Sequence, residues 1–471
     1  MTAGHLRAAL QWGVLALLFL APLPFGSVQP GFLLTIELTA AALGLGTILL
    51  ISRDEAARGA VPLTPLLICL GIVALAVFQI VPLPFSMAER FNPTADLVRP
   101  LIPYLGLDHP PRVSWSVAVP DTTDAVLRFT AYALLGLTTA VAFDTERSRR
   151  RLAVVLVASG VFQAVYGSAE YLTGRQHIFA YAKKYYLESA TGTLINRNHF
   201  ATLLAVALPF ALVLAIPKAH SGGAKRVLSW RERVVAADGG LGRSLAVGAA
   251  ALIWMGLLLS HSRAGLGAAT IGAIVVLVPF RGSRTARWTA AAGMIVLLGL
   301  LSLDLAQAPG ERFLTMRDEL EGKSGRPAVW RDASGLVAER PLLGYGFGTF
   351  ESVFPLAQSA DIDVHFDHAH NDWLEWTTEG GTVALVLAIA LLLVTLRATF
   401  GAVKSDVFGW RFRTASRGAI VVFALHAVWD FSLRIPAVAV MAAVLIGSAV
   451  APVEPDRVYP SPVEPIPGHD V

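Results

Sequence analysis

The residues best suited to acid–base chemistry gather between positions 365 and 375. His370 stands there among acidic, amide, aromatic and further histidine side chains, which are Asp367, His368, Asn371, Asp372, Trp373, Glu375 and Trp376. Histidine titrates near neutral pH and can act as a general base at that pH. We therefore expect His370 to be a catalytic base, and the sequence leaves open whether Asp367 or Glu375 orients its ring.

The same cluster has a second interpretation as a metal site. His365, His368 and His370, together with Asp367, are residue types that bind transition metals at short spacing. Most short histidine clusters in loops bind no metal, so we predict no metal and no cofactor. The single cysteine, Cys69, also excludes a cysteine-based metal site and a disulfide within the chain.

Two arginines could hold an anionic group. Arg263 follows Ser260-His261-Ser262 at the junction of two apolar runs. A guanidinium at membrane depth is costly and usually faces a polar cavity, although it can also extend to the interface. Arg326 lies four residues before Trp330 in the long polar segment. The fixed charge and bidentate geometry of arginine suit a diphosphate, but a surface arginine beside an aromatic residue is also common, so the residues alone leave the role of Arg326 open.

Further polar residues lie within or beside apolar runs and are candidates for substrate binding. Asn196-Arg197-Asn198-His199 opens one predicted span. Spacing by four residues predicts that His426, Asp430 and Arg434 share one helical face. Such a face can bind substrate or hold helices together, and for His426 and Asp430 we favour the structural role. The predicted substrate-binding residues are Arg197, Asn198, His199, His368, Asn371, His426, Asp430 and Arg434.

Three glycines at positions 344, 346 and 348 resemble a phosphate-binding loop only in their spacing. The strand–helix unit that gives such a loop its function is missing around them. We expect these glycines to form a turn that shapes the polar segment.

The composition indicates that these residues belong to a membrane protein. The 471 residues are 55% hydrophobic and only 15% charged, whereas soluble domains have about 25% charged residues. The sequence has no basic domain with interleaved aromatic residues, so it does not indicate nucleic-acid binding. We predict an all-α integral membrane protein of about twelve helices, with the first retained as a helix and not cleaved as a signal peptide. The predicted spans are 8–23, 32–51, 63–81, 125–143, 152–172, 194–216, 244–259, 264–280, 288–304, 380–396, 418–433 and 436–451.

The distribution of lysine and arginine predicts the orientation. The connections 144–151 and 217–243 are rich in these residues, whereas 24–31 has none. Positively charged loops remain in the cytoplasm, so we expect both termini inside and the segment 305–379 outside, in the periplasm. The predicted regions are a transmembrane part over 1–304 with a proline-rich outer segment at 82–124, a catalytic loop at 305–379, a transmembrane part over 380–451 and a disordered cytoplasmic tail at 452–471.

With these motifs in order, the chain resembles the O-antigen ligase and Wzy polymerase superfamily of bacterial membrane glycosyltransferases. The resemblance is carried by 196–200, Ser262-Arg263-Ala264-Gly265, 326–330, 344–350, His370-Asn371-Asp372-Trp373-Leu374 and 426–436. It implies a GT-C-type fold in the inner membrane with a large periplasmic loop between the ninth and tenth spans.

The resemblance also implies an activity. Such enzymes transfer a glycan from undecaprenyl diphosphate to an acceptor at the periplasmic face, without a metal ion. By this resemblance Arg263 and Arg326 hold the diphosphate and His370 activates the acceptor hydroxyl, with inversion at the sugar. The acceptor is left open among lipid A-core, a growing polysaccharide and a protein. A polytopic transporter is the alternative from a different class, but transporters usually place substrate residues at the membrane midplane.

Overall fold

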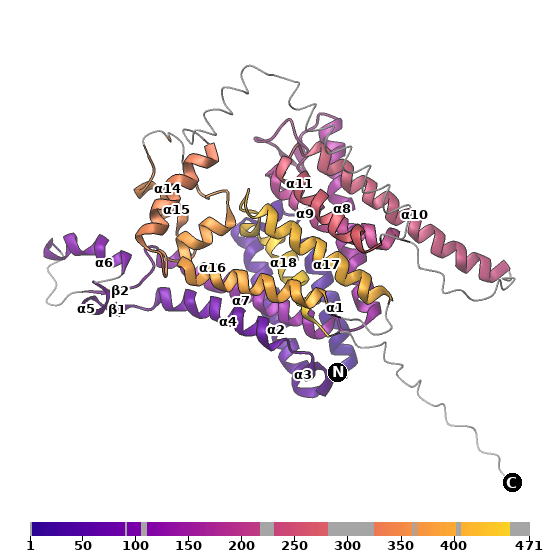
Figure 1. The fold of residues 1–471 in the computed structure, drawn as a ribbon, viewed down its shortest axis with the longest axis horizontal. Coiled ribbons are helices and arrows are strands. Elements are labelled where there is room, and N and C mark those ends of the chain that lie inside the picture. Colours follow the sequence, from indigo (N-terminus) through magenta and orange to yellow (C-terminus); the bar gives the residue numbers. More distant parts are fainter. Residues whose placement is uncertain are drawn as a thin grey trace, which may run out of the picture.

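The structure is a computed structural model that describes residues 2–89, 92–104, 111–216, 230–280, 325–359, 362, 365–401 and 407–452. The predicted span at 288–304, residues 305–324 of the predicted catalytic loop and nearly all of the tail lie outside these ranges. Within them the chain is almost wholly helical (Figure 1). Two short antiparallel pairs join β1 (Leu83–Pro84) to β2 (Arg112–Val113) and β3 (His177–Ile178) to β4 (Tyr181–Ala182).

Eight described helices are long and apolar enough to cross a membrane, and two shorter apolar helices accompany them. The chain is thus a multi-pass helical protein, and each predicted span except 288–304 falls on a described helix. The eight are α1 (Ala3–Leu20), α2 (Pro30–Arg53), α4 (Leu63–Ile80), α7 (Val119–Ala142), α8 (Glu146–Leu172), α9 (Arg197–Ala215), the Leu241–Leu259 part of α10 (Trp230–Leu259), and α16 (Asp372–Thr399). The shorter two are α11 (Arg263–Leu277) and α18 (Pro436–Val450).

The remaining helices connect or cover these spans. They are α3 (Glu55–Gly59), α5 (Phe85–Ala88), α6 (Pro93–Val98), α14 (Gly325–Glu339), α15 (Phe350–Val353) and α17 (Val407–His426), with the 3-10 turns η1 (Phe25–Ser27), η2 (Arg99–Tyr104), η3 (Val278–Phe280), η4 (Phe354–Leu356) and η5 (Ser432–Arg434). In Figure 1, α14 and α15 lie at the same end of the bundle as α5, α6 and the β1–β2 pair.

Helix α9 forms the centre of the bundle. In its most apolar stretch 83% of residues are buried, more than in any other candidate span among the described residues. It packs against α8, α10, α11 and α17. Small residues allow the helices around it to approach closely. At Gly418 of α17, for example, an added Cβ would lie only 2.8 Å from the carbonyl oxygen of Gly272 of α11. Such contacts between small residues are a common way for membrane helices to associate.

The glycine segment forms the turn that the sequence predicts. Gly344, Gly346 and Gly348 have φ values of 61°, 118° and 82°, a region that favours glycine. The proline-rich segment packs on this turn, since Trp115 donates its indole N–H to the carbonyl of Gly344 at 2.9 Å and Val117 donates its backbone N–H to Tyr345 at 3.1 Å. The turn and the proline-rich segment therefore form one layer at this end of the bundle.

One local expectation is wrong. His426, Asp430 and Arg434 do not share a helical face, because α17 ends at His426. The Asp372 N–H donates to the carbonyls of Ala427 and Asp430, at 2.8 and 3.2 Å, so these oxygens bond to another helix rather than to a further turn of α17. The following residues form a tight connection that reaches α18 through η5, with Pro436 at the first helical position.

The tryptophans after His370 join the start of α16 to neighbouring helices. Trp376 packs on Phe129 and Phe347, with ring centroids 5.3 and 5.4 Å away. Trp373 donates its indole N–H to the carbonyl of Ala424 at 3.2 Å. These rings join α16 to α7 and α17, so tertiary packing fixes the start of α16.

Candidate functional site

Three helices that meet at the candidate site begin with the same kind of N-cap. The side chains of Asn196, Ser262 and Asn371 accept hydrogen bonds from backbone N–H groups of α9, α11 and α16. Such caps satisfy N–H groups that have no partner inside the helix. Ser262 also donates to the side-chain oxygen of Asn198 at 2.8 Å, which ties the start of α11 to the start of α9.

His370 pairs with a carboxylate that the sequence did not suggest. Its Nδ1 lies 3.3 Å from Oδ1 of Asp430. The histidine keeps 21% of its side chain exposed, whereas that of Asp430 is fully buried. Among the described residues, the carboxylate that pairs with this ring is Asp430 and neither Asp367 nor Glu375. The backbone of His370 has a φ of 51°, an unusual left-handed conformation for a side chain of this size.

Asp430 lies at the centre of a buried polar cluster. Its Oδ2 is 3.6 Å from Nε2 of His199 and 3.4 Å from the hydroxyl of Ser432. Burial raises the pKa of the Asp430 carboxyl, but His199 and the hydrogen bond with His370 together lower that pKa below its usual value. His426 contacts Thr202 at 3.0 Å and Ser432 at 3.2 Å, so it belongs to the same cluster.

Arg326 lies beside this cluster. Its guanidinium donates to the carbonyl of Trp429 at 2.6 Å, immediately before Asp430 in the chain. Trp330, one turn further along α14, donates to the carbonyl of Ala369 at 2.8 Å, immediately before His370. Helix α14 therefore holds together the two segments that supply His370 and Asp430.

Arg263 and Arg197 are the first residues of α11 and α9. Arg263 is exposed, and its position follows Ser262, which bonds to Asn198. Arg197 lies over the ring of Tyr186, with 5.6 Å from the guanidinium carbon to the ring centroid. Contacts thus run from the start of α11 through Asn198 and His199 to Asp430, which brings the predicted residues of α9 and α11 into the same region as His370.

Arg434 has protein partners for its charge. The guanidinium pairs with Glu375 at 3.2 Å and with Glu379 at 2.6 Å, and only 13% of its side chain is exposed. Glu375 in turn lies 2.8 Å from Nδ1 of His368. Asn371 uses its side chain as the cap of α16. Arg434 and Asn371 thus have protein partners for their polar groups, and Glu375 links Arg434 to His368.

The histidines of the 365–370 segment do not converge. His365 pairs with Glu351 at 3.0 Å, His368 with Glu375 and His370 with Asp430. Over the described ranges no group of three His, Cys, Asp or Glu side chains is placed to hold a metal ion. Each of the three histidines instead pairs with a different carboxylate, at a distance suited to a hydrogen bond.

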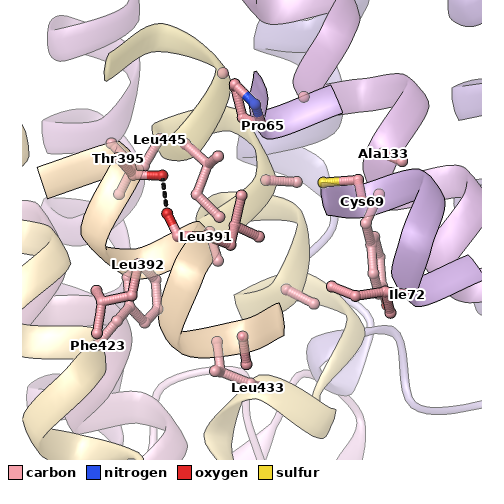
Figure 2. A pocket seen from close by; sticks show the side chains of 18 of the residues that line it. Pro65, Cys69, Ile72, Ala133, Leu391, Leu392, Thr395, Phe423, Leu433 and Leu445 are labelled. Carbon is pink, nitrogen blue, oxygen red and sulfur yellow. Dashed lines mark hydrogen bonds between the residues drawn. The ribbon is translucent and has the colours of Figure 1, made fainter. Parts of the chain in front are cut away.

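An apolar cavity of about 270 Å³ lies between α4, α7, α16, α17 and α18. Its polar lining includes Asp372 and Arg434 beside the site, and Figure 2 shows Cys69, Leu391 and Leu433 among the side chains around it. One carboxylate oxygen of Asp372 is buried without a hydrogen-bond partner in the described structure. The sequence could not locate this cavity, because its lining combines α4 and α7 with α16, α17 and α18, which lie far along the chain from them.

Comparison with known families identifies the chain. Residues 248–389 match the family model described as O-antigen ligase, Wzy_C. These residues form an O-antigen ligase-family domain, which makes the protein a membrane enzyme. The matched region includes Arg263, Arg326, His368 and His370, whereas Asp430 and His199 lie outside it. No curated protein matches the chain.

Proposed function

We propose that this O-antigen ligase-family enzyme transfers a glycan from undecaprenyl diphosphate to an acceptor hydroxyl at the periplasmic face of the bacterial inner membrane. The observation that carries the proposal is the pairing of His370 with Asp430 beside Arg326. A histidine held by a buried carboxylate is a suitable general base, and a fixed guanidinium is suited to a diphosphate.

The geometry supports a direct displacement. The Asp430 carboxylate accepts the Nδ1–H of His370, which leaves the Nε2 lone pair for the acceptor hydroxyl. As Nε2 takes the proton, the acceptor oxygen bonds to the anomeric carbon and the bond from that carbon to the diphosphate oxygen breaks. The departing diphosphate keeps the electron pair, and Arg263 and Arg326 stabilise its growing charge. Attack opposite the leaving group inverts the anomeric centre.

The apolar cavity supports a lipid-linked donor. It combines an almost wholly apolar lining with Asp372 and Arg434, which adjoin the candidate site. A polyprenyl chain requires such an apolar surface, and the diphosphate at its end would lie at the site, where Arg263 and Arg326 are the proposed cations. Since the lipid diphosphate is already an activated leaving group, this route requires no nucleotide, metal or cofactor.

A transfer assay with purified full-length protein tests the proposal. Undecaprenyl-diphosphate-linked glycan is incubated with lipid A-core, a second lipid-linked glycan or an acceptor protein, each with and without EDTA. We expect inverted product with one acceptor class and no effect of EDTA. The acceptor that reacts distinguishes a ligase from a polymerase or a protein O-oligosaccharyltransferase. Failure of every acceptor, or loss of transfer with EDTA and its recovery with added metal, would contradict the proposed mechanism.

A further inference from the structure

A second histidine–carboxylate pair lies beside the first. His368 Nδ1 is 2.8 Å from Oε1 of Glu375. The ring of His368 stacks on Phe431 at 4.1 Å with an interplanar angle of 21°, and His370 meets the same phenyl ring edge-on at 4.8 Å. Phe431 therefore fixes two imidazoles relative to one another, although only one base is needed for the proposed transfer.

The carboxylate of this second pair is unusually well fixed. Glu375 is 1% exposed, its Oε2 accepts the backbone N–H of Ala369 at 2.9 Å, and its Oε1 also pairs with Arg434. Arg434 is held from the other side by Glu379. Burying so many charges is costly unless each is paired, and an apolar replacement is often at least as stable. The arrangement therefore calls for a role beyond packing.

His368 is able to reach a ligand. Its side chain is 28% exposed, and no partner for its Nε2 occurs among the residues that the structure describes. The charged or titratable groups around it are Glu375 on α16, Arg434 on η5, Asp367 in its own segment and His199 on α9, with His370 across Phe431. Burial lowers the pKa of His368, but Glu375 and Asp367 raise it, and the pKa is above its ordinary value.

We propose that His368 is a second substrate-contacting residue, which donates a hydrogen bond from Nε2 to the diphosphate of the lipid-linked donor, and that Glu375 and Arg434 position it. This inference rests on the proposed function. His370 removes the proton of the acceptor, while His368 keeps its own proton and stabilises the diphosphate oxygen that receives the electron pair of the broken bond. His370 thus acts on the nucleophile and His368 on the leaving group.

A protonated His368 predicts that diphosphate binding depends on pH in a specific way. A histidine with a raised pKa remains an imidazolium up to a higher pH, and it loses that charge as the pH passes through the raised value. Glu375→Gln removes the carboxylate that raises the pKa of His368. In that variant the imidazolium is lost at lower pH, so binding of a diphosphate weakens at a lower pH than in the native enzyme.

Calorimetric titration of the purified full-length protein with inorganic pyrophosphate, repeated across pH, tests this without any transfer reaction. The protonation of pyrophosphate changes with pH in the same way in every sample, so a difference in pH dependence between variants comes from the protein. We expect His368→Ala to bind ~10-fold more weakly at neutral pH, in line with one lost charge-assisted hydrogen bond. Glu375→Gln should match the native enzyme at acidic pH and lose binding earlier as pH rises.

Glu379→Gln is the matched control. Glu379 also pairs with Arg434, lies one turn further along α16 and does not contact His368. We expect its pH dependence to follow the native enzyme. The inference is overturned if Glu375→Gln keeps the native pH dependence, if both glutamine variants shift equally, or if His368→Ala binds normally. Should Glu375→Gln fail to fold, the more exposed His368→Ala and His368→Gln decide the matter.

The two proposals can fail separately. Pyrophosphate binding that depends on His368, in a protein that transfers no glycan, contradicts the proposed function and supports the diphosphate site. Glycan transfer by a protein whose pyrophosphate binding is indifferent to His368 supports the proposed function and overturns the inference.

Discussion

Nδ1 of His370 lies 3.3 Å from Oδ1 of Asp430, a residue 60 positions further along the chain. The contact joins the segment before α16 to the connection between α17 and α18. It exists because α17 ends at His426 and the chain turns back towards Asp372. The pairing fixes the tautomer of His370, since a carboxylate at Nδ1 requires the proton on that nitrogen.

Asp430→Asn should therefore remove most of the activity. The amide can present its N–H to Nδ1 and favour the wrong tautomer, so we expect a loss comparable to that of His370→Ala, ~10²–10⁴-fold in initial rate. Initial rates of glycan transfer at matched protein concentration provide the measurement. Asp367→Asn is the control, because Asp367 is exposed and was an alternative partner for His370. A full rate in Asp430→Asn would show that His370 acts without this carboxylate.

Replacing Arg263 or Arg326 should reduce activity, whereas replacing the control arginine Arg331 should not. Arg326→Ala and Arg263→Ala are each expected to reduce transfer by ~10²–10³-fold, the usual cost of losing one stabilising donor for transition-state charge. Lysine at either position should rescue poorly, because a point charge does not reproduce bidentate contacts. Arg331→Ala is the control on α14, since Arg331 pairs with Asp332 and Ser359. Equal effects at Arg326 and Arg331 would indicate a role for α14 in folding only.

The motifs that sequence reasoning found are those whose residues are contiguous. The start of a helix at Asn371 and the three-glycine turn could be predicted because each depends on the local backbone preferences of a few successive residues. The pairing of Asp430 with His370 could not be predicted, because it depends on where α17 stops, which is set by backbone hydrogen bonds from Asp372. A periodicity of four residues suggests a helix, but it does not show where the helix ends.

The apolar cavity is a further consequence of packing and can be tested through Cys69. This is the single cysteine of the chain, it lines the cavity, and Figure 2 places Cys69 near Ala133. We expect a lipophilic maleimide to label Cys69, and undecaprenyl diphosphate to slow the labelling. A water-soluble diphosphate without the lipid should not protect the thiol. Equal protection by both compounds would mean that the lipid chain lies elsewhere.

Filling the cavity provides the corresponding activity test. Ala133→Trp adds a large side chain to its wall, and we expect KM for the lipid-linked donor to rise at least ~10-fold while kcat changes little. Such a split is typical of lost binding that is equal in the ground state and the transition state. Ala133→Val serves as a milder control. A fall in kcat at unchanged KM would place the effect on chemistry instead of lipid binding.

Gly381 fixes the junction between the capped start of α16 and its long apolar part. Its φ of 66° and ψ of −168° lie in a region open essentially to glycine alone. A Cβ at this position would also clash with the carbonyl of Leu342. We expect Gly381→Ala to lower the stability of the detergent-solubilised protein by at least ~1–3 kcal/mol, measured as a fall in the thermal unfolding midpoint.

Gly335 offers a matched comparison for that variant. It lies in the interior of α14, and a Cβ added there meets nothing within 4 Å. Alanine at such an exposed helical position should be neutral or stabilising by up to ~1 kcal/mol. Because Gly381 connects the segment of His370 to the membrane-embedded part of α16, its alanine variant should also lose activity below the unfolding temperature. Unchanged unfolding and full activity in Gly381→Ala would show that α16 tolerates a continuous helix at this junction.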